Sequence, residues 1–327
     1  MNNFLKNRNF TVVILGLLLF GGSQLSASCQ NVSTKKDDFV SQISQKRIDR
    51  YFQDIIRLSP RPPESDTFRK CRLYLVNTLK SFSLKAWEEP FTANTPKGAI
   101  SMANVVAEKK GDTNRIIYLA SHIDTKIIDG IEIQGANDSG SSTAALLELA
   151  RVISKHNTKF TYRFVFFDGE ESIGKDMNER DGLYGSREHV RRLKANNLIS
   201  NVHAMILLDM IGDKDPVINR DLNSSPELYS LFAVCCQRLG YTNLSTGKAS
   251  YMYDDHVPFL RAGVPSLDLI DFDYGPNNSF WHTEKDTAEN VSVKSIFKIV
   301  QVVACMLESF EKPENYRKLS RPGLDNS

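Results

Sequence analysis

The sequence is poor in cysteine and carries no block of charge of one sign. Its five cysteines form no CxxC pair, and none lies near a histidine at the spacing of zinc ligands, which excludes a cysteine-based zinc module. The formal net charge is only +2 over 327 residues, so the composition gives no reason to expect nucleic acid as a partner. No internal repeat stands out, which argues against a solenoid or a propeller.

Long hydrophobic runs are also missing, apart from a short one near the N-terminus. Two basic residues precede an apolar run over residues 11–20, which is too short to span a bilayer comfortably, and small residues follow it. This order is typical of a secretory signal over residues 1–28, so we expect an exported protein. Ser26-Ala27-Ser28-Cys29 is similar to a loose bacterial lipoprotein site, which favours a periplasmic protein anchored by lipid at Cys29. The alternative is plain cleavage nearby, with no anchor.

A polar tether at residues 29–38 and a polar tail at 314–327 flank the remainder of the chain. No linker divides residues 39–313, and 41% hydrophobic content is enough for one large core, so we expect a single domain. The cysteines of this domain are expected to be buried free thiols, because free cysteine is usually buried. They are Cys71, Cys235, Cys236 and Cys305.

Apolar residues in the domain alternate between helical and strand-like spacing. Helical spacing predicts helices over residues 39–58 and 66–82, the second with Leu73, Leu75, Val76 and Leu79 inward. Further helices are expected over residues 139–154, after Gly185 and over 290–310. Short apolar runs predict strands over residues 84–91, 104–109, 116–121, 164–167, 205–208 and 266–270. This alternation indicates the α/β class, with a central mixed, mostly parallel sheet and helices on both faces.

Polar residues directly follow three of the expected strands. In open α/β sheets, binding sites form beyond the carboxyl ends of the strands, so these residues indicate a site. They are His122 and Asp124, Glu170 and Glu171, and Asp209.

Two further segments carry residues of the same kinds. Asp138 lies in a tight turn of small residues before a helix, and Trp281-His282 lies in a loop rich in Gly, Pro and Asn. Asp, Glu and His are zinc ligands, and three of them leave a fourth position open for catalysis. Each residue alone also has a purely structural interpretation, such as a helix N-cap for Asp138 or a solvated pair for Glu170 and Glu171. Their combined placement favours a metal site.

The ordered motifs together closely resemble the M28-type zinc peptidases and, within that superfamily, the glutaminyl cyclases. The resemblance runs over residues 59–307. Its segments are SHIDTK at 121–126, GANDSG at 135–140, FFDGEES at 166–172, LYGSREH at 183–189, LLDMIGD at 207–213, DDHVPFLRAGVP at 254–265 and WHT at 281–283. It implies a zinc aminopeptidase-like fold and an enzyme that converts N-terminal glutamine of peptides or proteins into pyroglutamate, with release of ammonia.

The resemblance also implies a role for each matching residue. One zinc per chain would be held by Asp138, Glu171 and His282 and would act as a Lewis acid on the γ-carbonyl of the substrate, while its α-amine is the nucleophile. Glu170 matches the general acid/base, which passes a proton to the leaving ammonia. The remaining matches are Asp209 and Asp254 as acidic hydrogen-bonding partners, Trp281 as a pocket wall, and His122 as a substrate-binding residue.

The sequence departs from the family at a few positions. The segment between Glu171 and Leu183 lacks a tryptophan that many cyclases carry there, which puts one pocket wall in doubt. Asp268 stands where some relatives have histidine, so the residues behind the metal ligands are expected to differ.

Two other functions remain open on the residues alone. A two-zinc aminopeptidase would take His122, Asp138 and Asp209 as ligands of a second metal. A non-catalytic binding protein on the same fold is the other alternative. The cyclase is favoured by DDH at 254–256, by Trp281 directly before His282, and by TPKG at 95–98. We expect a monomer.

Overall fold

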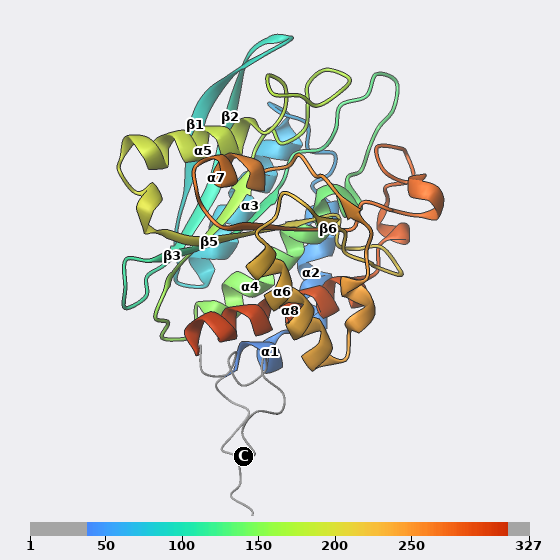
Figure 1. The fold of residues 1–327 in the computed structure, drawn as a ribbon. Coiled ribbons are helices and arrows are strands. Elements are labelled where there is room, and N and C mark those ends of the chain that lie inside the picture. Colours follow the sequence, from blue (N-terminus) through green and yellow to red (C-terminus); the bar gives the residue numbers. More distant parts are fainter. Residues whose placement is uncertain (1–37, 313–327) are drawn as a thin grey trace, which may run out of the picture. The chain divides into compact units, whose positions relative to one another are not determined.

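A six-stranded mixed sheet forms the centre of the computed structural model, which describes residues 38–312 (Figure 1). The strands lie in the order β1-β2-β4-β3-β5-β8, in which β4, β3, β5 and β8 are parallel and β1 and β2 pair antiparallel. Their bounds are Lys85–Thr95 (β1), Gly98–Lys109 (β2), Ile116–His122 (β3), Thr161–Phe167 (β4), Val202–Asp209 (β5) and Ser266–Ile270 (β8). The predicted α/β class with a mixed, mostly parallel sheet is confirmed.

The central strands are buried on both faces, because side chains alternate between two hydrophobic layers. Every residue of β3 is buried. Ile117 and Leu119 belong to the larger core cluster, while Tyr118 and Ala120 belong to the smaller one on the other face.

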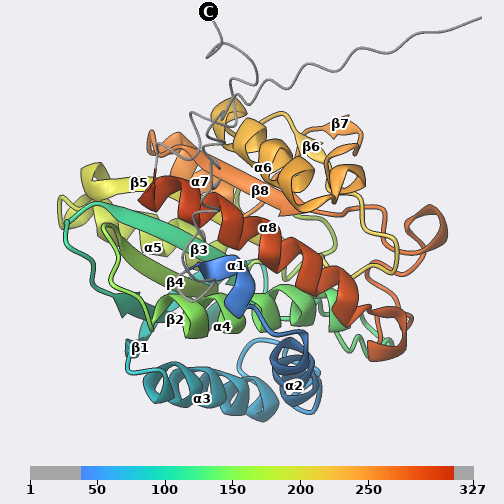
Figure 2. The same cartoon turned by 90° about the horizontal axis from the view of Figure 1, so that it is seen from below.

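Helices cover both faces of the sheet, as predicted (Figure 2). The larger core contains side chains of α1, α2, α3, α4, α6 and α8, and the smaller core lies under α5 and α7. The bounds are Phe39–Gln42 (α1), Gln45–Ile56 (α2), Asp66–Ser81 (α3), Ser142–Ile153 (α4), Tyr184–Ala195 (α5), Pro226–Leu239 (α6), His256–Arg261 (α7) and Val293–Glu311 (α8). A separate pair of short parallel strands is formed by β6 (Arg220–Asp221), which precedes α6 in the sequence, and β7 (Ala249–Ser250), which follows it.

Several sequence-based boundaries were wrong. The helix predicted over 39–58 is two helices, because Ile43 has an extended backbone that ends α1. Leu73 does not face inward and is 57% exposed, since the buried side chains of α3 follow the stripe through Phe68, Cys71 and Leu75 and leave Leu73 outside it. The predicted strands at 84–91 and 104–109 are longer and meet as one hairpin.

The helix expected from Ser139 begins only at Ser142. Residues Ala136–Ser141 form a wide turn in which Asp138 and Ser139 have non-helical backbone angles. Asp138 is therefore not the N-cap of α4, and its side chain is free to point elsewhere.

The four cysteines in the described part of the chain are buried and free, as predicted. Cys29, the signal segment, the tether up to residue 37 and the C-terminal tail lie outside the described residues. Within residues 38–312, no helix combines the length and the apolar character needed to cross a membrane.

Candidate active site

The ends of the parallel strands bring the predicted polar residues to one edge of the sheet. β3 ends at His122 and β5 ends at Asp209, while β4 leads into the turn that carries Glu170 and Glu171. That turn needs Gly169, which has a φ of 69°, and a Cβ there would lie 2.5 Å from the sulfur of Met102. The sharp turn is what directs the two glutamates back over the strand end.

Backbone hydrogen bonds fix the segments that carry the carboxylates. The N–H groups of Glu170 and Glu171 donate to the two carboxylate oxygens of Asp124, each at 3.1 Å. The N–H of Asn137 donates to Asp286 at 2.7 Å, and that of Asp138 donates to the same carboxylate at 3.3 Å. Both acceptors are buried, so these loops are held rigidly where side chains must converge.

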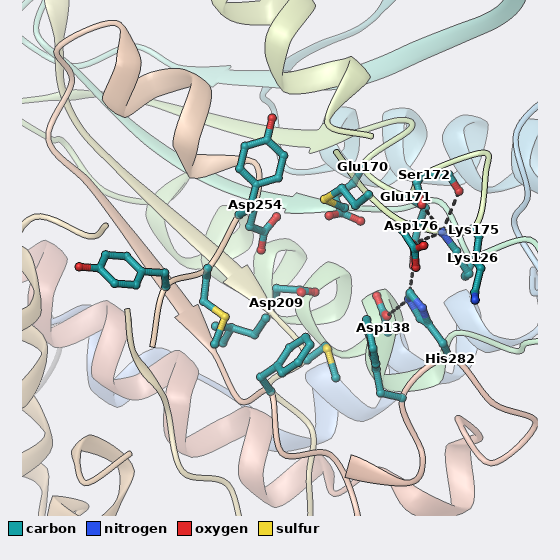
Figure 3. A pocket seen from close by; sticks show the side chains of 18 residues that line it. Lys126, Asp138, Glu170, Glu171, Ser172, Lys175, Asp176, Asp209, Asp254 and His282 are labelled. Atoms are coloured by element: carbon teal, nitrogen blue, oxygen red, sulfur yellow. Dashed lines mark hydrogen bonds and ion pairs between the residues drawn. The ribbon is translucent and has the colours of Figure 1, made fainter. Parts of the chain in front are cut away.

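Asp138, Glu171 and His282 converge on one point of this edge (Figure 3). His282 Nε2 lies 2.9 Å from Glu171 Oε1 and 3.4 Å from Asp138 Oδ2. His282 adopts a left-handed φ of 54°, a conformation that is uncommon outside glycine and is found at functional sites. One nitrogen and two carboxylates at these separations match the donors that zinc accepts.

Electrostatics agrees with a cation at this point. Burial lowers the pKa of His282, but the carboxylates of Glu171 and Asp138 outweigh it and raise that pKa to about 10. Burial raises the pKa of Asp138, whereas the hydrogen bonds and charges of His122 and His282 lower it below its usual range. The two carboxylates would neutralise a divalent ion, so the residues present fit zinc.

Glu170, Asp209 and Asp254 line the other side of the same pocket (Figure 3). Burial is the main cause that raises the pKa of all three. Neighbouring carboxylates add to it, and for Asp254, where Asp209 contributes, the pKa reaches about 7. The group can therefore hold and release protons near neutral pH.

His122, predicted as a substrate-binding residue, lies behind the pocket wall. Its side chain is 1% exposed and is not among those that line the pocket. Its Nε2 lies 2.9 Å from Asp138 Oδ1 and 3.1 Å from Asp209 Oδ1, beneath the pocket floor. Together these three residues form a second group that could hold a metal, as the aminopeptidase alternative requires.

The cavity in front of these groups measures ≈ 330 Å³, which suits a small side chain and the start of a peptide. Trp281 forms part of its wall, with its ring stacked on His282 at 4.0 Å and tilted against Phe272 at 4.8 Å. The loop of residues 251–253 adds two tyrosines and a methionine to the wall. This loop and Phe272 therefore supply aromatic surface, although residues 172–182 lack a tryptophan.

Three residues that organise the site carry little or no signal of that role in the sequence. Asp286 orients Asp138, but nothing in its polar loop distinguishes it from a surface acid. Asp124 was recognised only as a polar residue at a strand end, and its backbone partners were not foreseeable. Lys126 lies 3.6 Å from Glu171 Oε2 and also donates to Ser172, and its place in SHIDTK was the only signal.

Three side chains of metal-ligand type at a parallel sheet edge, beside a buried carboxylate and an open cavity, are typical of metal-dependent α/β enzymes. Residues 104–307 match the profile of peptidase family M28, and the chain belongs to that family. It is 31% identical to the mouse glutaminyl-peptide cyclotransferase-like protein, over 76% of this chain and 72% of that one. It is 27% identical to the Drosophila melanogaster glutaminyl-peptide cyclotransferase, over 75% and 76%.

Solved structures place the fold in the same group. The glutaminyl cyclase of an Acidobacteriales bacterium superposes with a TM-score of 0.80 at 29% identity, over 87% of this chain and 99% of that one. The Porphyromonas gingivalis glutaminyl cyclase superposes with a TM-score of 0.75 at 26% identity, over 82% and 99%. The resemblance to glutaminyl cyclases that the sequence motifs indicated is confirmed.

Proposed function

We propose that this enzyme is a glutaminyl-peptide cyclotransferase, which closes the N-terminal glutamine of peptides or proteins into pyroglutamate and releases ammonia. The relatives of this name cover most of the domain, and every residue that the motifs single out for this chemistry except His122 lines one pocket. The observation that carries the proposal is the position of Glu170, a buried carboxylate beside three metal-ligand side chains in a cavity of ≈ 330 Å³.

The residues that would hold zinc in this pocket are Asp138, Glu171 and His282, with one ion at this site. When bound there, zinc supplies a Lewis acid that polarises the γ-carbonyl of the substrate glutamine. The pocket walls, Trp281 among them, confine the glutamine side chain so that its α-amine lies against its own γ-carbon. Much of the rate gain then comes from proximity, because nucleophile and electrophile belong to one molecule.

Glu170 moves the proton that the reaction requires. The α-amine nitrogen forms a bond to the γ-carboxamide carbon and loses one proton to the Glu170 carboxylate. The same proton passes to the departing nitrogen as the carbon–nitrogen bond of the carboxamide breaks, and ammonia leaves. Asp209, whose neighbour is Asp254, accepts a hydrogen bond from the substrate nitrogen and holds it in line.

Ammonia release from Gln-β-naphthylamide, run beside Leu-β-naphthylamide with free naphthylamine monitored in both, tests this proposal. The cyclase produces ammonia from the glutamine substrate and no free naphthylamine from either. Free naphthylamine without ammonia would refute the cyclase and support a two-zinc aminopeptidase, which the 2.9 Å contact between His122 and Asp138 makes the second candidate.

We also infer that the protein is exported and held at a bacterial membrane by lipid at Cys29, on the strength of the N-terminal basic, apolar and small-residue order. One acyl chain binds a membrane only marginally, so a stable anchor needs more than one. Cys29→Ser should move the protein from the membrane fraction to the soluble periplasmic fraction, and an unchanged distribution would contradict the anchor.

A further inference from the structure

A third group of metal-ligand side chains lies in the interior, outside the pocket. It consists of Asp221 in β6, His256 at the start of α7 and Asp268 in β8, and none of these residues lines the cavity. All three are buried, and one candidate ligand atom from each lies within 4.8 Å of the others. Three segments far apart in the sequence therefore meet at one buried point.

His256 is buried beside the two carboxylates of this group. Its Nε2 lies 3.0 Å from Asp221 Oδ2, yet neither ring nitrogen makes a hydrogen bond of acceptable geometry within the described residues. The ring is therefore held beside one carboxylate of the group and lies near the other, Asp268, from which its Nδ1 is 3.9 Å away.

Asp268 is left without partners although it is fully buried. Its side chain is 0% exposed, and neither carboxylate oxygen has a hydrogen-bond partner in the part of the chain that the structure describes. His256 Nδ1 lies 3.9 Å from one of its oxygens, and the neighbouring charges that act on it are the carboxylates of Asp254, Asp209, Asp221 and Asp255. A buried carboxylate without a partner is costly, so this position calls for a cation or a proton. Both of its oxygens are available as ligands.

Asp221 is oriented in the way that metal-binding carboxylates are. Ser224 Oγ donates to Asp221 Oδ2 at 2.7 Å, and the backbone N–H groups of Met252 and Asn223 donate to Oδ1 at 2.9 and 3.1 Å. Hydrogen bonds of this kind fix the orientation of ligating side chains. The carboxylate is thus held facing His256 by residues outside the group.

We propose that Asp221, His256 and Asp268 bind a second divalent ion, separate from the pocket, and that the ion is zinc. Two carboxylates balance the charge of a divalent ion, while an imidazole among three ligands favours zinc over magnesium or calcium, which prefer oxygen. Because β6, α7 and β8 each supply one ligand, the ion ties together segments next to Asp254 and has a structural role. The proposal does not depend on the cyclase activity.

Metal content tests the proposal directly. The purified full chain is saturated with Zn²⁺, freed of loosely bound ion by gel filtration, and its zinc is counted per chain by plasma mass spectrometry. We expect two ions in the wild type, one in Asp268→Asn and one in His282→Asn. Asp271→Asn is the matched control, a buried carboxylate directly after β8 and outside the group, and should keep two.

Two other results of these zinc counts would overturn the proposal. A wild-type count of one ion overturns the proposal, whether or not any variant folds. Two ions in the wild type with one in Asp209→Asn and two in Asp268→Asn also overturn it, since the second ion then belongs to His122, Asp138 and Asp209. A zinc anomalous difference map from wild-type crystals locates the ions without any variant. Failure of the ammonia assay would leave all these counts unaffected.

Discussion

Two adjacent glutamates allow proton transfer and metal binding to be tested separately. Glu170→Gln keeps the size of the side chain and the backbone hydrogen bond to Asp124, and it removes only the ability to carry a proton. General acid–base catalysis contributes roughly 10²–10⁴-fold, so we expect kcat to fall by that factor. This equals about 3–5 kcal/mol of lost transition-state stabilisation. Because the three candidate ligands are untouched, zinc content should stay at the wild-type value.

Glu171→Gln is the matched variant one residue further along. It replaces a carboxylate whose Oε1 lies 2.9 Å from His282 Nε2, and it leaves one carboxylate, Asp138, in the group. A neutral amide is a much poorer zinc ligand than a carboxylate. We therefore expect zinc content to fall together with activity, and part of the activity to return at high Zn²⁺ concentration.

Both variants should be assayed for ammonia release under substrate saturation, with zinc measured on the same samples and folding checked by circular dichroism. The expected pattern is loss of kcat at full zinc for Glu170→Gln and loss of both for Glu171→Gln. Wild-type kcat in Glu170→Gln would refute its assignment as the proton carrier. Full zinc and full activity in Glu171→Gln would remove it from the ligands.

Further variants test packing and charge. Arg61→Met leaves the buried carbonyls of Ile123 and Gly135 without donors, at about 1–3 kcal/mol each, so the midpoint of urea unfolding should fall clearly. Burial and Asp213 raise the pKa of Asp271 to about 7, so ionisation of this carboxyl costs no stability below pH 4 and an increasing amount as pH rises to 7. Asp271→Asn should therefore gain stability over wild type between pH 4 and 8, by up to about 4 kcal/mol, and a pH-independent difference would contradict this. Trp281→Ala should raise KM roughly tenfold, or about 1.4 kcal/mol of lost contact, at unchanged zinc content, and an unchanged KM would remove Trp281 from the binding wall.

The sheet could be predicted well from the sequence because its strands are short apolar runs bounded by polar residues. The run at 116–121 is a fully buried strand, and the polar residues after it lie at the edge that the parallel arrangement predicts. The ends of the helices were harder to predict from the sequence. Nothing in the local pattern distinguishes an N-cap at Asp138 from the wide turn that turns its side chain toward His282, because tertiary contacts with Asp286 hold that turn.

The metal-ligand side chains could be predicted because each carries a local signal, namely a strand end, a small-residue turn or an aromatic neighbour. The residues that hold these ligands in place carry no such local signal. Asp124 acts through backbone N–H groups 46 and 47 residues away, and Asp286 acts through those 148 and 149 residues away. The burial of His122 was equally hidden, since a histidine that ends a strand can point into a pocket or beneath it.

The crowding of acids at this edge makes a cation or a proton there favourable. Asp138, Glu170 and Asp209 are buried within one pocket wall, where each ionised carboxylate raises the cost of the next. His122 contacts Asp138 and Asp209, and His282 contacts Asp138. A histidine that ligates zinc, as proposed for His282, is neutral and offsets no charge. A divalent ion would remove the repulsion between the carboxylates that bind it. Glu170 is not among these ligands, and burial raises its pKa. The same burial that favours a cation at this edge thus gives Glu170, which is not among the proposed ligands, the chemistry of a proton carrier.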